Sequence, residues 1–319
     1  MRIAFAVILA FVAAAHCAED GQQRHDVILA VGAGGEPAYA EAFSKWAGHW
    51  QESCKKAGAQ LTLVGLGADE KECRVRVAKA IAEQPADGTT PLWLVLLGHG
   101  TFDGKEAKFN LPGDDLPVSE VAEWLKRFQR PVIVVCGFSA SGAWLKPLAS
   151  GGRIIITATK SGSESNFARM GGFLSEVIGD PAADLDKDGQ TSLLEAWLAA
   201  AQRTNDFYKN EGRLATEHSL LEDNGDGLGT PSDWFRGVRV VKKAKGKAEP
   251  DGLRAHQIHL IASAAEKELS PERRAQRDSL EIELAKLREA KPSMDEAAYY
   301  KQLEAILLQL AKIYHTPES

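Results

Sequence analysis

Residues 132–142, with the sequence VIVVCGFSASG, combine a run of β-branched residues with a turn made of small residues. The apolar run predicts a strand buried on both faces, and a tight turn after such a strand is a common place for a nucleophile in α/β proteins. Cys136 alternates with Val132 and Val134, so we expect its thiol to be buried and inert. Ser139, in the turn, is therefore the stronger candidate for chemistry.

Before and after residues 132–142, the sequence alternates between apolar strands and amphipathic helices. We expect strands at residues 25–34, 60–67, 91–100, 131–138 and 152–159, and helices at 39–58, 69–84, 118–129 and 166–179. Such an alternation predicts an α/β fold, with a mostly parallel sheet covered by helices on both sides. Functional side chains of these sheets gather at the carboxyl ends of the strands. His99 and Ser139 each follow a predicted strand.

The composition is that of a globular protein with one main domain and an appendage. Of the 319 residues, 44% are hydrophobic and 26% are charged, and the formal net charge of −6 gives no reason to expect a nucleic-acid partner. Residues 1–18 are predicted to be a signal peptide, because Arg2 precedes an apolar run that is too short to span a bilayer. We expect an exported protein, periplasmic or extracellular, without a later membrane segment. Lipid attachment at Cys17 is disfavoured by the preceding His16.

Export would permit disulfides among the cysteines that remain after removal of the signal peptide. These are Cys54, Cys73 and Cys136. Cys54 and Cys73 both lie near the end of a predicted helix and are the candidates for a pair.

The C-terminal part of the chain has a different character. Residues 239–253 are basic, contain Gly and Pro, and are predicted to be a linker. Residues 254–319 are predicted to form an antiparallel helical hairpin, available for self-association. Its two apolar stripes are Leu280, Leu284 and Leu287 in the first helix, and Leu303, Leu307, Leu310 and Tyr314 in the second. Ser293 and Glu296 fit a capping box at the start of the second helix.

Two short motifs, taken together, resemble a known family. Residues 96–104, LLGHGTFDG, place a His-Gly pair after one strand, and residues 139–142, SASG, follow the next. This arrangement resembles the caspase-like, clan CD cysteine peptidases, and among them the legumain family. The resemblance implies a caspase-like three-layer sandwich over residues 25–238, with His99 as base. It also implies that Ser139 stands where the family has its nucleophilic Cys.

The same resemblance implies further site residues. Gly100 and Gly142 would shape the turns and the oxyanion site. Residues 154–168 resemble the family's next strand and the loop that shapes its substrate pocket, which would place Ser161, Glu164 and Ser165 near that pocket.

The exchange of Cys for Ser matters chemically. A thiol is partly ionised near neutral pH, whereas a hydroxyl needs a well-placed base that a third group orients. Asp103 is the local candidate for this orienting role, although an Asp-Gly pair is also typical of a hairpin turn. Ser139 is either a reacting group, a relic, or a hydroxyl that binds substrate.

Residues 184–195, DLDKDGQTSLLE, match the calcium loop of an EF-hand. The expected ligands are three alternating carboxylates, a main-chain carbonyl and a closing glutamate, namely Asp184, Asp186, Asp188, Gln190 and Glu195. We expect a structural Ca²⁺ here, the alternative being an acidic loop that holds no metal. Residues 222–233 form a second acidic loop, which opens with Glu222 and is better interpreted as a polar turn. His256 and His259 have helical ligand spacing but are expected to be packing residues.

Three functions are compatible with these features. The first is an exported hydrolase that cleaves peptide bonds with Ser139 as nucleophile and His99 as base. The second is an inactive relative that binds a peptide or a protein partner. The third is a calcium-stabilised structural protein of the cell envelope.

Overall fold

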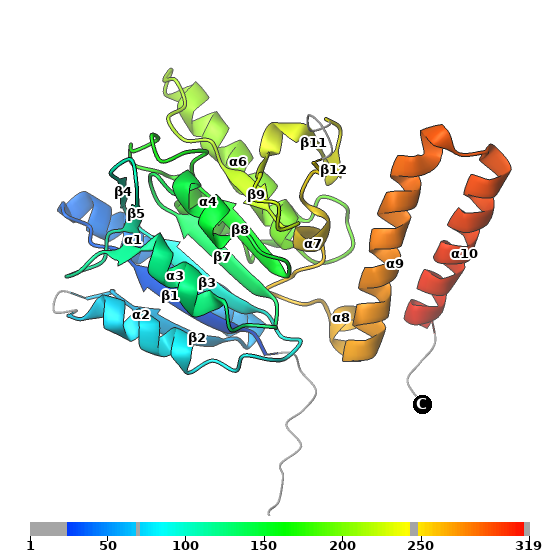
Figure 1. The fold of residues 1–319 in the computed structure, drawn as a ribbon, viewed down its shortest axis with the longest axis horizontal. Helices are drawn as coiled ribbons and strands as arrows, with labels where there is room; N and C mark the ends of the chain where they lie inside the picture. The colour runs from blue at the N-terminus through cyan, green and yellow to red at the C-terminus, as the bar shows by residue number, and fades with distance from the viewer. Residues whose placement is uncertain (1–23, 68–70, 243–247, 316–319) are drawn as a thin grey trace, which may run out of the picture.

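A computed structural model of the chain describes residues 24–67, 71–242 and 248–315 (Figure 1). The predicted signal peptide at residues 1–18 and Cys17 lie outside these residues. Within the described ranges, no helix combines the length and the apolar character needed to cross a membrane.

The described residues form one central sheet of seven strands in the order β10-β9-β8-β7-β3-β1-β2. Five of its strands run parallel: β1 (Asp26–Val31), β2 (Gln60–Val64), β3 (Leu92–Leu97), β7 (Val132–Gly137) and β8 (Arg153–Thr157). Two short strands extend it in antiparallel fashion: β9 (Leu220–Glu222) and β10 (Thr230–Pro231). The predicted α/β fold with a mostly parallel sheet is confirmed.

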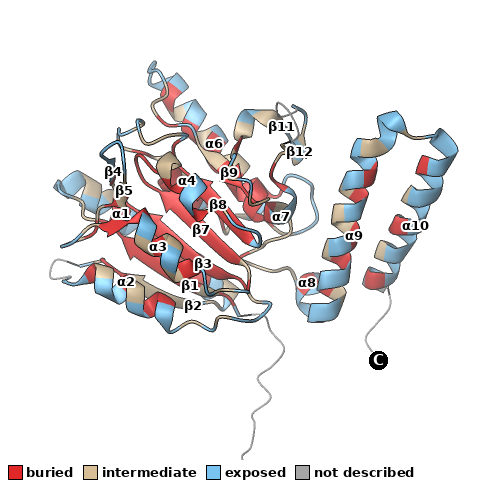
Figure 2. Ribbon diagram, in the orientation of Figure 1, coloured by how far each residue is buried: buried red, intermediate tan, exposed pale blue. Residues whose placement is uncertain are grey.

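Helices cover both faces of this sheet (Figure 1). One face carries α1 (Pro37–Ala57), α5 (Met170–Val177) and α6 (Leu193–Asn210). The other carries α2 (Cys73–Ala82), α3 (Val118–Leu125) and α4 (Gly142–Leu148). The strands β3 and β7 are buried along their whole length, as Figure 2 shows, because they are apolar on both faces.

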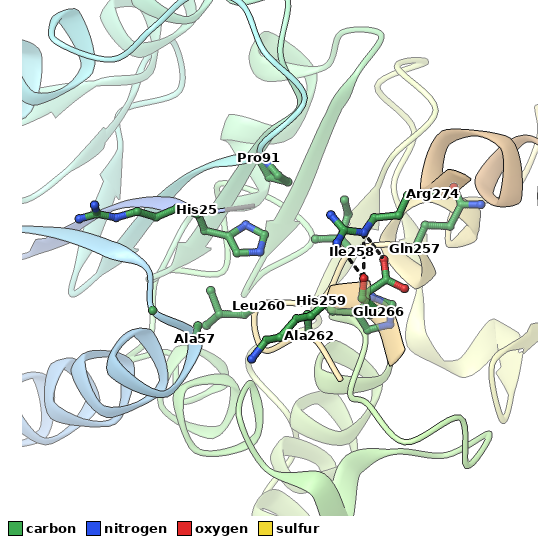
Figure 3. A pocket seen from close by; sticks show the side chains of 13 residues that line it. His25, Ala57, Pro91, Gln257, Ile258, His259, Leu260, Ala262, Glu266 and Arg274 are labelled. Carbon is green, nitrogen blue, oxygen red and sulfur yellow. Dashed lines mark hydrogen bonds and ion pairs between the residues drawn. The ribbon is translucent and has the colours of Figure 1, made fainter. Parts of the chain in front are cut away.

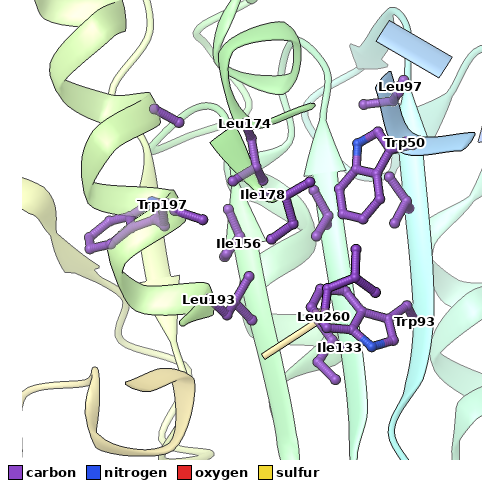
Figure 4. Close-up of a cluster of buried hydrophobic side chains, with 14 of the residues drawn as sticks. Trp50, Trp93, Leu97, Ile133, Ile156, Leu174, Ile178, Leu193, Trp197 and Leu260 are labelled. Carbon is purple, nitrogen blue, oxygen red and sulfur yellow. The ribbon is translucent and has the colours of Figure 1, made fainter. Parts of the chain in front are cut away.

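Each face of the sheet has its own hydrophobic core. Trp50 of α1 and Trp197 of α6 pack on the face to which Trp93 of β3 points (Figure 4). Leu260, from beyond the predicted linker, completes the same core. The residues directly after 253 therefore belong to the sheet domain. Burial of Leu260 in this core removes its apolar surface from water and so holds the segment against the sheet.

The cysteines lie in separate cores. Cys54 belongs to the core under α1, whereas Cys73 and Cys136 belong to the core on the opposite face. In the described part of the chain the three cysteines form no disulfide, so the pairing of Cys54 with Cys73 is wrong. Burial raises the pKa of the Cys136 thiol strongly, which fits an inert core residue.

Two small sheets lie outside the central one. The first consists of β4 (Gly100–Phe102), β5 (Ala107–Phe109) and β6 (Leu116–Pro117), and the second of β11 (Phe235–Arg236) and β12 (Arg239–Val240). Short 3₁₀ helices lie at Pro181–Ala183, Ser232–Trp234 and Lys291–Ser293.

The C-terminal region has two short helices, α7 (Leu253–His256) and α8 (Ala264–Glu268), before the predicted hairpin. The hairpin itself consists of α9 (Pro271–Ala290) and α10 (Glu296–His315), which lie side by side and project from the sheet domain (Figure 1).

The hairpin is confirmed, but two details of its predicted second helix are wrong. The buried residues of α10 are Tyr299, Ile306 and Ile313, whereas Leu307 and Tyr314 are exposed. The residues that point at α9 follow a seven-residue spacing, as is usual for paired helices. The helix is capped by Asp295, which accepts from the Ala298 N–H at 3.1 Å; the Ser293 hydroxyl instead donates to the Ala290 carbonyl.

Candidate functional site

His99 lies just after β3, in a setting made of aromatic rings. Its imidazole packs edge-on against Tyr39 and Phe43, with ring centroids 4.8 and 5.1 Å away, and against Phe167 at 5.8 Å. Tyr39 and Phe43 come from α1, and Phe167 from the loop before α5. The sequence contains no motif that marks these rings as neighbours of His99.

The protonation of His99 follows from this setting. Burial lowers the pKa of the imidazole, and a hydrogen bond to the main chain of Gly34 opposes the shift without cancelling it. The lowering favours the neutral ring, in which one of the two nitrogens is a hydrogen-bond acceptor.

Ser139 lies just after the neighbouring strand β7, and its hydroxyl is fully engaged with the main chain. The side chain is 2% exposed. Its Oγ accepts from the Gly100 N–H at 3.1 Å and donates to the Gly100 carbonyl at 3.1 Å. Among the hydrogen bonds of the described residues, none joins the His99 ring to this hydroxyl. Ser139 therefore ties the end of β7 to the residue that follows His99.

The turn after Ser139 is tightly built. Ala140 has a positive φ of 59°, which is unusual for a residue with a side chain, and its N–H donates to the Glu164 carbonyl at 2.8 Å. Gly142 is required by space, since a Cβ there would lie 2.1 Å from the Ser161 nitrogen. The structure thus brings His99, Gly100, Ser139 and Gly142 together at one rim of the sheet.

The loop that contains Ser161, Glu164 and Ser165 was expected to shape a substrate pocket. It lies at the same rim, and hydrogen bonds within the loop and to His218 hold it in place. The Glu164 carboxylate accepts from the Lys160 and His218 main-chain N–H groups at 2.9 and 3.1 Å and also pairs with the His218 ring. The Ser161 hydroxyl lies 2.8 Å from that of Ser163, and Ser165 is exposed. Glu164 is thus committed to holding the loop.

Asp103 does not approach the His99 ring through a hydrogen bond in the described structure. Its Oδ1 accepts from the N–H groups of Lys105 and Glu106 at 2.8 Å each, and these bonds hold the pKa of this exposed carboxyl below its usual range. Asp103 is the capping residue of a turn, as the Asp-Gly pair suggests.

The predicted calcium loop at residues 184–195 brings its carboxylates together. Oxygen atoms of Asp184, Asp186 and Asp188 lie within 4.8 Å of one another, as do ligand atoms of Asp186, Glu195 and His256. Such a group of oxygen donors fits a hard divalent cation. Glu195 is 1% exposed and accepts from the Leu185 N–H at 2.7 Å, so its carboxylate faces the loop.

This loop also fastens the start of the C-terminal region. The Asp186 carboxylate lies 3.0 Å from the His256 ring, and the Leu193 N–H donates to the Ile258 carbonyl at 2.7 Å. Gln190, expected to bind a metal through its carbonyl, uses its side-chain Oε1 to accept from the Ser263 N–H at 3.1 Å. The loop and the segment at 256–263 therefore form one unit.

A cavity of about 290 Å³ lies at the opposite end of the sheet (Figure 3). It is lined by His25, Pro91, His259 and Arg274, among others, and Figure 3 shows the first two entering from the amino ends of β1 and β3. The cavity is therefore separate from the rim that carries His99 and Ser139. His25 and His259 are both packed among neighbouring side chains, and this burial lowers their pKa values to about 4 and about 3 respectively.

Comparisons with known proteins give a limited result. No protein family matches the chain, and no curated protein sequence matches it. Among solved structures, the Drosophila initiator caspase Dronc is similar with a TM-score of 0.44 and 10% identity, over 65% of this chain and 82% of that one. Caspase-1 from Spodoptera frugiperda is similar with a TM-score of 0.40 and 8% identity, over 63% of this chain and 87% of that one.

Proposed function

We propose that this protein is an exported, legumain-like member of the caspase-like peptidase fold that does not hydrolyse peptides but binds an extended polypeptide at the rim formed by β3 and β7. The observation that carries the proposal is the state of Ser139. Its hydroxyl is buried, and both its donor and its acceptor functions are engaged with Gly100.

A hydrolase would need this hydroxyl to behave differently. A serine nucleophile must give its proton to a base within hydrogen-bond reach and must face the scissile carbonyl. Here the proton is directed at the Gly100 carbonyl, and moving it would break two buried hydrogen bonds at once. The geometry therefore favours a structural role for Ser139.

The same rim offers groups that suit a bound polypeptide. Burial lowers the pKa of His99, which favours the neutral ring, and a neutral imidazole has one nitrogen that can accept a hydrogen bond from a peptide N–H. Phe102, on β4, is 40% exposed and lies against Gly162, so it offers an apolar surface beside the loop at 161–165. Apolar contact combined with a few placed polar groups is the usual composition of a binding site.

The loop at residues 184–195 is proposed to bind Ca²⁺ through Asp184, Asp186, Asp188, the Gln190 carbonyl and Glu195. The clustering of these oxygens supports it. When bound, the ion would supply positive charge that neutralises the crowded carboxylates. Because this loop holds the segment at 256–263, the ion would act as a structural clamp.

Two measurements on the full chain test the binding function. The first is labelling by a fluorophosphonate probe, which reacts with activated serines; we expect none, and stoichiometric labelling that is lost in Ser139→Ala would establish a hydrolase instead. The second is selection of ligands from a phage-displayed random peptide library. We expect enriched peptides whose affinity falls at least tenfold in Phe102→Ser. Leu253→Ser is the matched control, since Leu253 is 43% exposed and lies near the amino ends of the strands. Equal loss in both variants would contradict binding at this rim.

A further inference from the structure

Glu222, the last residue of β9, has a carboxylate whose hydrogen bonding is incomplete. The residue is 0% exposed. Its Oε1 accepts from the Gly225 N–H at 2.6 Å and from the Gly227 N–H at 3.4 Å. Its Oε2 is buried and has no hydrogen-bond partner among the described residues. Two amides of the loop that follows hold Oε1, so the carboxylate that carries the unpartnered Oε2 lies beside that loop.

The loop opened by Glu222 has the main-chain pattern of the loop opened by Asp184. In each, the first carboxylate accepts from the amides three and five positions later: Asp184 accepts from Lys187 and Gly189 at 2.6 and 3.1 Å, as Glu222 does from Gly225 and Gly227. The residues at these two positions have positive φ in both loops, 64° and 93° in the first and 86° and 73° in the second.

The side chains at positions three and five of the two loops match as well. In the second loop the Asn224 Oδ1 accepts from the Asp226 N–H at 2.9 Å, and the Asp226 Oδ1 accepts from the Leu228 N–H at 2.7 Å. In the first loop, Asp186 and Asp188 each accept from the amide two positions later, at 3.3 and 2.9 Å. Oxygen-bearing side chains therefore occupy positions one, three and five of both loops.

Other acidic side chains lie close to Glu222 in this loop, and Asp223 and Asp226 add negative charge around its carboxylate. Asp223 itself is occupied by capping α7, since its Oδ2 accepts from the Arg254 N–H at 2.9 Å.

The Arg153 guanidinium interacts electrostatically with Glu222. Its Nη atoms donate to the carbonyls of Leu148 and Leu125, and its Nε is buried without a hydrogen-bond partner among the described residues. It makes no hydrogen bond to the Glu222 carboxylate among the described residues. Among the described residues, the Oε2 atom of Glu222 therefore has neither a hydrogen-bond donor nor an ion-pair partner.

We infer that the loop at residues 222–230 binds a second calcium ion, through the carboxylates of Glu222 and Asp226 and the side-chain carbonyl of Asn224. This site is independent of the loop at 184–195. It lacks a closing carboxylate, because the twelfth position is Asp233, which pairs with Lys242. A site with fewer charged ligands binds calcium more weakly, and we expect a Kd of about 10⁻⁴–10⁻³ M, as in extracellular modules.

Calcium titration of the full chain by isothermal calorimetry tests the inference. We expect two classes of site, and Glu222→Gln should remove the weaker class and leave the tighter one. The double variant Asp184→Asn, Asp186→Asn should do the reverse, which separates this inference from the site proposed at 184–195. Asp233→Asn is the matched control and should leave both classes in place. An unchanged stoichiometry in Glu222→Gln, or complete loss of binding in the double variant, would overturn the second site.

A second measurement keeps the result interpretable if Glu222→Gln alters folding. In the presence of a chelator, this variant should melt at the same temperature as the wild type or higher, because it removes the charge of a buried carboxylate that has one unpartnered oxygen. Millimolar calcium should then raise its melting temperature less than that of the wild type. A variant that is destabilised with the chelator, yet equally stabilised by calcium, would show that Glu222 has only a structural role.

Discussion

Replacing Ser139 by alanine separates the structural role of this residue from a catalytic one. The substitution removes the two hydrogen bonds between Oγ and Gly100 and leaves a buried N–H and a buried carbonyl without their partner. Each unsatisfied buried group costs about 1–3 kcal/mol, so with two such groups we expect the free energy of unfolding to fall by about 2–6 kcal/mol. For a domain of this size that corresponds to a drop in melting temperature of about 4–24 °C.

The assay is equilibrium unfolding in urea together with a thermal melt, followed by the fluorescence of the buried tryptophans. Ser165→Ala is the matched control, since Ser165 lies exposed on the loop at the same rim and should change stability by less than about 0.5 kcal/mol. If the Ser139 hydroxyl were instead a nucleophile held ready for reaction, it would contribute little to stability, and its removal would leave the free energy of unfolding unchanged. If Ser139→Ala is as stable as Ser165→Ala, the structural role is refuted.

Three further predictions concern other parts of the molecule. Burial lowers the pKa of His25 to about 4, so below pH 6.5 the unfolded chain takes up a proton that the folded chain excludes. The free energy of unfolding should therefore be highest above about pH 6.5 and fall by a few kcal/mol towards pH 4. In urea titrations at several pH values, His25→Gln should reduce this pH dependence. Calcium should raise the melting temperature, and Asp186→Ala should remove most of the rise; an equal rise would exclude the first loop as a site. Gly142→Ala should lower stability by about 1–3 kcal/mol, because its Cβ would meet the Ser161 backbone, whereas Gly151→Ala has free space and should change little in the same titrations.

The sequence predicts the sheet well where hydrophobic periodicity is strong. The runs at 91–100 and 131–138 correspond to β3 and β7, and each strand lies within its predicted run, because a short apolar run between turn residues is typical of a buried strand. β9 and β10 were not predicted, since strands of two or three residues in a polar context have no periodicity to detect. β9 also depends on pairing with β8, which is distant in the sequence.

The candidate site was predictable in position but not in detail. His99 and Ser139 follow adjacent parallel strands, and the carboxyl ends of such strands necessarily lie at one rim. The rings of Tyr39 and Phe167 around His99 come from other elements, and only tertiary packing brings them there. The direction of the Ser139 hydroxyl depends on the Gly100 backbone, which no local pattern specifies.

The two acidic loops show why a calcium-loop pattern matches residues 184–195 but matches residues 222–233 only in part. A calcium-loop pattern requires Asp at position one, because a short side chain in a loop reaches the amides three and five positions later. At Glu222 the main chain is instead fixed by the pairing of β9 with β8, in which Glu222 lies opposite Ile155. Glutamate has one methylene more than aspartate, and from this strand position its Oε1 accepts from the N–H groups of Gly225 and Gly227. A pattern that requires Asp at position one therefore does not include a loop whose first carboxylate makes the same main-chain contacts from a glutamate.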